Sequence, residues 1–109
     1  MKKVDFPQGT LEMLILRVLS SEANHGFGIS QKIHVLSKEV LKVEEGSMYP
    51  ALHRMQERGW IESEWGKTEN NRRAKFYKLT RIGEKRLGDE AESWETLVQA
   101  IGDVLKGDL

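Results

Sequence analysis

Cysteine is absent from the 109-residue chain, so it can form neither disulfide bonds nor a metal site built on thiolates. Long apolar runs are also missing, because no stretch approaches the roughly 20 residues that a membrane-spanning helix needs. The segment from Met1 to Gly9 is too short and too polar for a secretory signal. We therefore expect a cytoplasmic protein that has no membrane partner.

Net charge is missing as well, since 17 Lys and Arg balance 17 Asp and Glu. The charges are unevenly distributed along the chain. Residues 46–79 carry seven basic and four acidic side chains, whereas residues 80–109 carry four basic and seven acidic ones. A locally basic segment can bind phosphate even when the total charge is zero. Overall neutrality therefore does not exclude a nucleic-acid partner.

Groupings typical of enzymes are not found either. There is no glycine-rich phosphate loop and no Ser, His and acid set with a plausible pocket, so we predict that the chain is not an enzyme. His25, His34 and His53 could suggest a metal sensor, but they are nine and nineteen positions apart, whereas zinc ligands come in close pairs. We predict no metal site and no cofactor, and His25 is more simply a turn residue with its hydrogen bonds satisfied.

Apolar spacing predicts three helices before residue 60. Thr10 should cap the first helix, whose apolar stripe is Leu11, Leu14, Ile15, Val18 and Leu19. Met13 and Leu16 make this helix apolar on a second side, which hints at a subunit interface. A glycine-rich turn at residues 24–28 precedes a second, short helix that contains Ile29, Ile33 and Leu36. Residues 40–43 could form a brief strand.

The third helix is expected to start at Ser47 as its cap, with Pro50 in its first turn and Gly59 as its stop. Met48, Leu52 and Met55 should face the core. Its outward or flanking side chains are of hydrogen-bonding or cationic type: Ser47, Tyr49, His53, Arg54, Gln56 and Arg58. Such a surface suits base edges and phosphates, although it also suits an ordinary solvated helix.

After residue 59 the period changes from helical to two. Residues 60–65 and 74–79 are predicted to form a hairpin whose connection, residues 66–73, is polar and basic. Lys67, Arg72, Arg73 and Lys75 gather at its tip, and Glu69 is the only acid between Gly66 and Tyr77. The hairpin could be a solvated loop, but beside a polar helix it favours DNA binding. Glu62 and Glu64 count against a continuous basic surface.

Thr80 should cap a long last helix whose apolar residues are spaced by four and three, as in a coiled-coil seam. We predict a homodimer whose interface combines this seam with the first helix: Leu11, Ile15, Leu87, Ala91, Trp94, Val98, Ile101 and Leu105. The fold class is therefore mainly α (α+β), a winged helix-turn-helix with a long C-terminal dimerisation helix. Residues 1–80 would form the DNA-binding part and residues 81–109 the dimerisation helix, within one compact domain.

Four segments, in this order, resemble the PadR family of bacterial regulators. They are the run from Gln8 to Leu16, the run from His25 to Ile29, the run from Glu45 to Met55, and the run from Asn70 to Tyr77 with Leu79 and Thr80. The most specific motif is Tyr-Pro-x-Leu-x-Arg, read here from Tyr49 to Arg54, which few other winged helices share. Phe27 stands where Tyr is frequent, and Met48 and Met55 replace the usual Leu, all of them near-conservative packing changes.

The resemblance implies a homodimeric repressor that blocks a promoter at an inverted repeat. It also implies DNA contacts by Ser47, Tyr49 and Arg54 from the third helix, to which we add His53. The predicted hairpin is the wing of this fold, and Arg72, Arg73 and Lys75 would add DNA contacts from it. A winged helix that binds protein as an adaptor is the alternative, which an apolar third helix would have favoured.

Trp94 has two interpretations. It could simply fill the dimer seam, or it could form a stacking platform for a small planar aromatic effector, since some PadR members resemble multidrug sensors with aromatic-lined dimer pores. In the second case, helix motion would change the spacing of the recognition helices and so the affinity for DNA.

Overall fold

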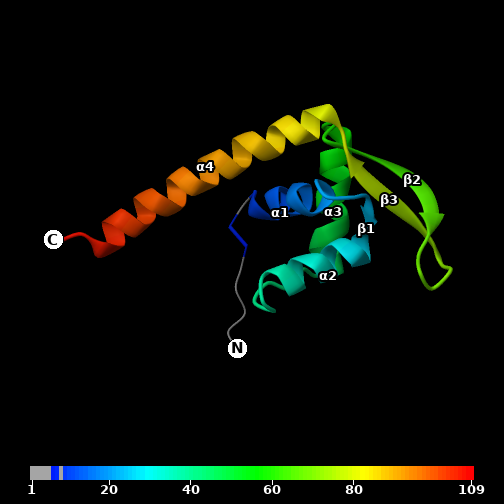
Figure 1. Cartoon of the computed structure of the whole chain (residues 1–109), viewed down its shortest axis with the longest axis horizontal. Coiled ribbons are helices and arrows are strands. Elements are labelled where there is room, and N and C mark those ends of the chain that lie inside the picture. The colour runs from blue at the N-terminus through cyan, green and yellow to red at the C-terminus, as the bar shows by residue number, and fades with distance from the viewer. Residues whose placement is uncertain (1–5, 8) are drawn as a thin grey trace.

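The computed structural model describes residues 6–7 and 9–109. Along the chain it places α1 (Thr10–Leu19), β1 (Asn24–His25), α2 (Gly26–Leu36), α3 (Glu45–Glu57), β2 (Ile61–Lys67), β3 (Arg73–Leu79) and α4 (Arg81–Lys106). The strands form an antiparallel sheet in the order β1-β3-β2. Figure 1 shows the first three helices gathered beside this sheet, with α4 leaving as a long arm. The predicted fold class is confirmed.

The core lies between α1, α2, α3 and the base of the hairpin. The inward positions predicted for α3 are confirmed, since Met48, Leu52 and Met55 are fully buried. They pack with fully buried side chains of α1, α2 and β2, namely Ile15, Leu16, Ile29 and Ile61. The second helix contains Ile29, Ile33 and Leu36 as predicted, and Leu36, in its last turn, is exposed.

Two predicted helix caps are wrong, and both helices begin earlier than expected. The cap of α1 is Gly9, at φ 85°, while the Thr10 hydroxyl donates to the carbonyl oxygen of Pro7 at 2.6 Å. The cap of α3 is Glu44, so Ser47 lies within the first turn and Pro50 lies inside the helix. Proline has no N–H, so the Gly46 carbonyl cannot receive the usual helical hydrogen bond.

The predicted stop of α3 is confirmed. Gly59 adopts φ 77°, and its amide donates to the carbonyl of Gln56 at 3.0 Å. The next amide, that of Trp60, donates to the carbonyl of Met55 at 3.0 Å. These two bonds form the Schellman motif, in which a left-handed glycine satisfies the last carbonyls of a helix. They also fix the direction in which the chain enters β2.

The predicted turn at residues 24–28 is instead a two-residue strand followed by the start of α2. Asn24 and His25 pair with Tyr77 and Phe76 of β3, which a local pattern cannot reveal because the partner is about fifty positions away. The His25 imidazole Nδ1 accepts a hydrogen bond from the Gly28 amide at 3.1 Å and so caps α2. The strand expected at residues 40–43 does not form.

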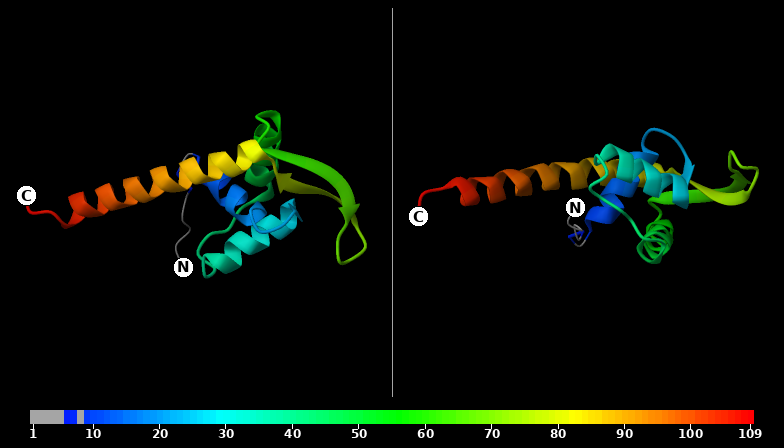
Figure 2. Two further views of the ribbon diagram at one scale, coloured as in Figure 1. Left: turned by 45° about the horizontal axis from the view of Figure 1, so that its top comes forward. Right: turned by 90° about the horizontal axis from the view of Figure 1, so that it is seen from below.

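The capping of α4 by Thr80 is confirmed, since its hydroxyl accepts from the Gly83 amide at 3.1 Å and donates to the Gly59 carbonyl at 2.5 Å. The start of α4 is thus fastened to the end of α3. Its first turns pack on α1, and the remainder projects away from the hairpin in both views of Figure 2. Among the described residues, no helix is both long and apolar enough to cross a bilayer.

Candidate nucleic-acid interface

The exposed side chains of α3 divide between two flanks and an outer edge. Ser47, Tyr49, His53 and Arg54 are all exposed, as a surface role requires. At 3.6 residues per turn, His53 lies opposite the buried residues, whereas Tyr49 lies on one flank and Ser47 and Arg54 lie on the other. The structure therefore brings these four onto one helix without placing them on a single face.

Arg54 contacts α1. Its guanidinium Nη2 donates to the carboxylate Oε1 of Glu12 at 2.7 Å, and the Glu12 side chain is only 14% exposed whereas that of Arg54 is 48% exposed. Charge-assisted bonds of this kind are stronger than neutral ones, and partial burial reduces their screening by water. Arg54 thus ties α3 to α1 and keeps about half of its side-chain surface exposed. The sequence interpretation missed Glu12, which is 42 positions away in the chain.

Tyr49 packs on the start of α2. A Cβ built at Gly26 would lie 2.9 Å from the Tyr49 ring carbon Cε1, so only glycine allows this close approach. Burial raises the pKa of the Tyr77 phenol above its ordinary value of 10.0, and the nearby Tyr49 phenol raises it further. The close packing on Gly26 holds Tyr49 at the junction of α2, α3 and the sheet, where it is half exposed.

His53 has a neighbour on its own helix. Its imidazole Nε2 lies 2.8 Å from the carboxylate Oε1 of Glu57, one turn later, and both side chains are well exposed. An exposed pair of this kind contributes little to stability. The contact leaves the imidazole on the outer edge of α3, where it can exchange Glu57 for another partner.

The hairpin separates its charges between its two faces. β2 and β3 pair without a bulge from Ile61 with Leu79 to Lys67 with Arg73. Because successive residues of a strand point to opposite faces, Trp65, Lys67, Arg73 and Lys75 share one face at the outer half. Glu62 and Glu64 fall on the opposite face, so these two acids do not interrupt the basic surface.

The basic face of the wing continues the face that packs on α3. Nearer the base, this face carries Ile61 and Tyr77, both buried in the core. Between base and tip, the Ser63 hydroxyl donates to Gln56 Oε1 of α3 at 3.3 Å. The outer half of the wing therefore projects past α3, and the face that carries its cations is the same face that contacts α3 nearer the base. Figure 1 shows the hairpin projecting past the helical part of the molecule.

The loop between the strands is shorter than predicted. It spans residues 68–72 and is closed by hydrogen bonds from the Thr68 amide to the Arg72 carbonyl at 2.8 Å and from the Asn71 amide to the Thr68 carbonyl at 2.9 Å. Asn71 adopts φ 61°, a left-handed conformation that asparagine tolerates better than most residues. The turn leaves Arg72 exposed at the tip, next to Arg73.

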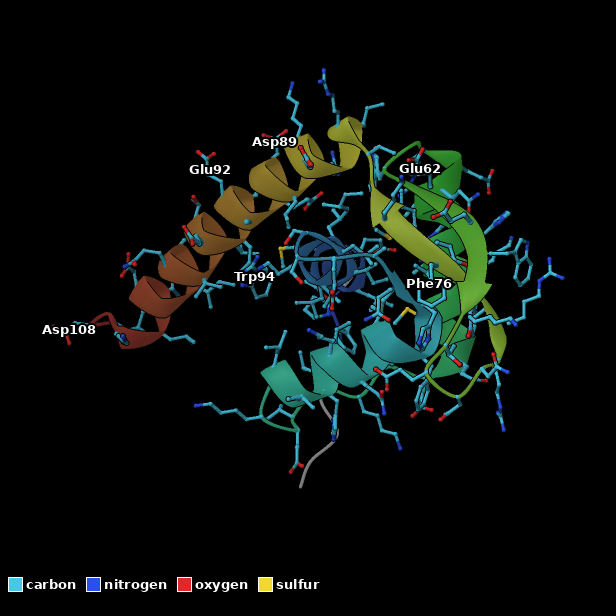
Figure 3. All side chains as sticks on the ribbon, turned by 45° about the vertical axis from the view of Figure 1, so that its right-hand side comes forward. Glu62, Phe76, Asp89, Glu92, Trp94 and Asp108 are labelled. Carbon is cyan, nitrogen blue, oxygen red and sulfur yellow. The ribbon has the colours of Figure 1, made fainter. Side chains whose placement is uncertain are left out.

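The residues predicted for self-association fall into two groups. Leu11 and Ile15 are buried in the core of their own chain, Ile15 completely, so they present little or no surface to a second copy. Leu87 and Ala91 are partly covered, whereas the outer seam of α4 is exposed: Trp94, Val98, Ile101 and Leu105. In Figure 3, Trp94 lies on the side of α4 turned toward α1, and Asp89 and Glu92 lie on the other side.

Within the part of the chain that the structure describes, no three His, Asp or Glu side chains gather closely enough to hold a metal ion. His25 caps α2, His34 Nδ1 lies 3.1 Å from the Leu41 carbonyl oxygen, and His53 adjoins Glu57. Each histidine thus has its own local partner.

A family model described as the transcriptional regulator PadR-like family matches residues 15–89. The match begins within α1 and ends within α4, so it includes α3 and the whole hairpin. Among curated proteins, a transcriptional regulator of Mycobacterium tuberculosis is 26% identical over 97 residues, which cover 89% of this chain and 87% of that protein.

Solved structures of similar proteins share the arrangement. A transcriptional regulator from Clostridium thermocellum superposes with a TM-score of 0.82 at 28% identity, covering 91% of this chain and 96% of that one. A PadR-like transcriptional regulator from Bacillus cereus has a TM-score of 0.78 at 31% identity, covering 93% of this chain and 96% of that one. The likeness thus extends over nearly the whole length of each chain, α4 included.

Proposed function

Because the chain belongs to the transcriptional regulator PadR-like family, whose members are non-enzymatic DNA-binding regulators, we propose that it represses transcription as a homodimer on an inverted-repeat operator. The observation that supports this most is the continuity of the polar surface of α3 with the basic face of the wing. Repression would follow from occupation of a promoter. A chromosomal target would place the protein in the cytoplasm.

Two kinds of contact are proposed. Tyr49 and His53 would lie nearest the bases in the major groove, and Ser47 would hydrogen-bond to the backbone beside them. Arg72, Arg73 and Lys75 would bind phosphates along the neighbouring backbone or minor groove. Arg54, being paired with Glu12, would reach a phosphate only with the outward part of its guanidinium.

Self-association would use α4. Beyond the first turns of this helix, the apolar residues Trp94, Val98 and Ile101 are between 38% and 49% exposed, and a contiguous exposed apolar surface of this kind marks an interface. We keep the two-part division proposed from the sequence, in which residues 81–109 would be the dimerisation helix and residues 1–80 the DNA-binding part. Residues 1–5 and 8 of that part lie outside the described residues.

Sedimentation would test the dimer. A carboxylate at Ile101→Glu would be buried in the seam without a partner, so we expect monomers at micromolar concentration and much weaker operator binding. Ser93→Glu is the matched control, since Ser93 is exposed on the side of α4 that carries Asp89 and Glu92. If Ile101→Glu sedimented as the wild type does, the proposed interface would be wrong.

Selection of bound duplexes from a random pool would test the DNA-binding mode. The proposal predicts two inverted half-sites whose centres lie about one helical turn, roughly 34 Å, apart or a multiple of it. Enrichment of a single unrepeated site, or no enrichment, would contradict it.

An effector at Trp94 is a further part of the proposal. The indole is 38% exposed in the single chain, and two copies would approach each other across the seam. A planar cationic dye should quench its emission and lower operator affinity. If no member of a varied dye panel did so, Trp94 would have only a packing role.

A further inference from the structure

Trp65 is an exposed aromatic residue at the outer half of the wing. Its side chain is 57% exposed, whereas Tyr77 and Phe76 on the neighbouring strand are buried and half-buried. An indole gains most of its stabilisation from burial, so leaving it open on a hairpin forgoes that gain. The prediction of DNA contacts from the sequence did not include it. Trp65 lies on the basic face of the wing, beside the cations predicted to bind phosphates.

Two cations lie over the same ring. The guanidinium carbon of Arg73 is 4.6 Å from the ring centroid, and the ammonium nitrogen of Lys75 is 5.6 Å from it. Lys75 is the direct cross-strand partner of Trp65, and Arg73 lies two residues away on the same face. Attraction between cation and ring holds both long side chains close to the indole. Their positive charges are thereby concentrated in one place.

Among the described residues, these two clustered cations have no anionic partner. None of the ion pairs among residues 6–7 and 9–109 involves Arg73 or Lys75. Glu62 pairs with Lys78 at 3.3 Å on the other face. Two neighbouring cations repel each other unless an anion joins them. A phosphate between them would relieve that repulsion, and the indole would then face the adjoining deoxyribose.

We propose that Trp65 is itself a DNA contact, with its indole packed against the sugar of the backbone between the phosphates that Arg73 and Lys75 bind. The inference rests on the proposed function. In an intact duplex the base faces are stacked, and the ring already has cations over it, so a sugar edge is the apolar surface it can meet. The contact is independent of base sequence and adds to the phosphate contacts that orient the protein on its site.

Fluorescence of single-tryptophan variants tests the contact directly. A variant with Trp60→Phe and Trp94→Phe retains only Trp65, and its emission should be quenched and shifted as a short operator duplex saturates it. The matched control carries Trp60→Phe and Trp65→Phe and retains only Trp94, which lies on α4 away from the wing. Its emission should not change. Duplex binding that leaves the emission of Trp65 unchanged would overturn the proposal.

The affinity of Trp65 variants for a duplex, measured at several salt concentrations, distinguishes a direct contact with the sugar from a role that only holds Arg73 and Lys75 in place. Trp65→Leu should weaken duplex binding about tenfold, Trp65→Phe less, and both should keep the wild-type dependence on salt because the same phosphates are still bound. Wild-type affinity, or a salt slope reduced as far as in Arg73→Ala, would overturn a direct contact. Thermal unfolding of each variant would check that the fold is retained. If Trp65→Leu disrupted the hairpin, the comparison would rest on Trp65→Phe. A wild-type protein that bound no duplex would instead refute the proposed function.

Discussion

Glu12→Gln tests how the chain restrains Arg54, the cation that α1 and α3 share. The carboxylate accepts from the guanidinium at 2.7 Å and is largely covered, whereas Arg54 is half exposed. Fully exposed pairs contribute between about 0.2 and 1 kcal/mol, and breaking a fully buried pair costs about 3–5 kcal/mol. The amide of Gln can still accept one hydrogen bond. We therefore expect the free energy of unfolding to fall by about 1 kcal/mol.

The same change should strengthen binding to DNA. It removes one negative charge per protomer from the border of the proposed interface and releases Arg54 to pair with a phosphate. The plot of log affinity against log salt should become steeper by up to about one per added phosphate contact, which is two for a dimer. Affinity at low salt should rise several-fold, for unrelated duplexes as well as for the operator.

Two measurements on the same preparations check these outcomes. Urea unfolding gives the stability, and fluorescence anisotropy of a labelled duplex at several salt concentrations gives the affinity and slope. Glu22→Gln is the control, because it makes the same chemical change at an exposed residue outside the elements of the interface. If Glu12→Gln matched this control in both, the restraint on Arg54 would be disproved. Weaker DNA binding at every salt would contradict it too, since the carboxylate would then present Arg54 to the DNA.

Further predictions concern stability. Gly83→Ala should lower the free energy of unfolding by about 3 kcal/mol, because its Cβ would overlap the carbonyl oxygen of Trp60. Gly88→Ala, whose Cβ would meet no atom within 4 Å, should instead stabilise α4 by about 1 kcal/mol, and denaturant unfolding that ranked the two variants the other way would refute this. The raised pKa of Tyr77 means that the unfolded chain loses the phenolic proton first, so its contribution to stability is complete below pH 10 and is lost as the pH rises from there through the folded-state pKa. In a Tyr49→Phe variant, whose only tyrosine is Tyr77, ultraviolet titration should show the phenol ionising above its ordinary pKa of 10.0, and ionisation at or below that value would contradict this.

The fold could be predicted from the sequence wherever the signal is local. Helical spacing located the buried Met48, Leu52 and Met55, and Gly59 and Thr80 were correctly placed at the ends of their helices. The caps at Thr10 and Ser47 were wrong because a cap is set by the backbone that enters the helix. Both helices begin earlier in the chain than the Thr or Ser that was expected to cap them, with Gly9 and Glu44 as N-caps, neither of which makes a side-chain capping hydrogen bond.

Features that depend on distant partners could not be predicted in this way. The strand β1 exists only because β3 pairs with it, and the position of Arg54 depends on Glu12 from another helix. The seven residues predicted to contact DNA remain a prediction, which their exposure on α3 and the wing supports. Trp65 could have been added, since the hairpin register places it opposite Lys75 and on the face of the wing cations.

The proposed function depends on α3 and the wing forming one phosphate-binding surface, which a homodimer would present twice. Its most direct test is the salt dependence of duplex binding by the wild type and by the double variant Arg72→Ala, Arg73→Ala. We expect the variant to bind every sequence more weakly, with a slope that is shallower by up to about one for each phosphate that it no longer binds. Equal affinity and equal slope for the two proteins would show that the wing binds no phosphate.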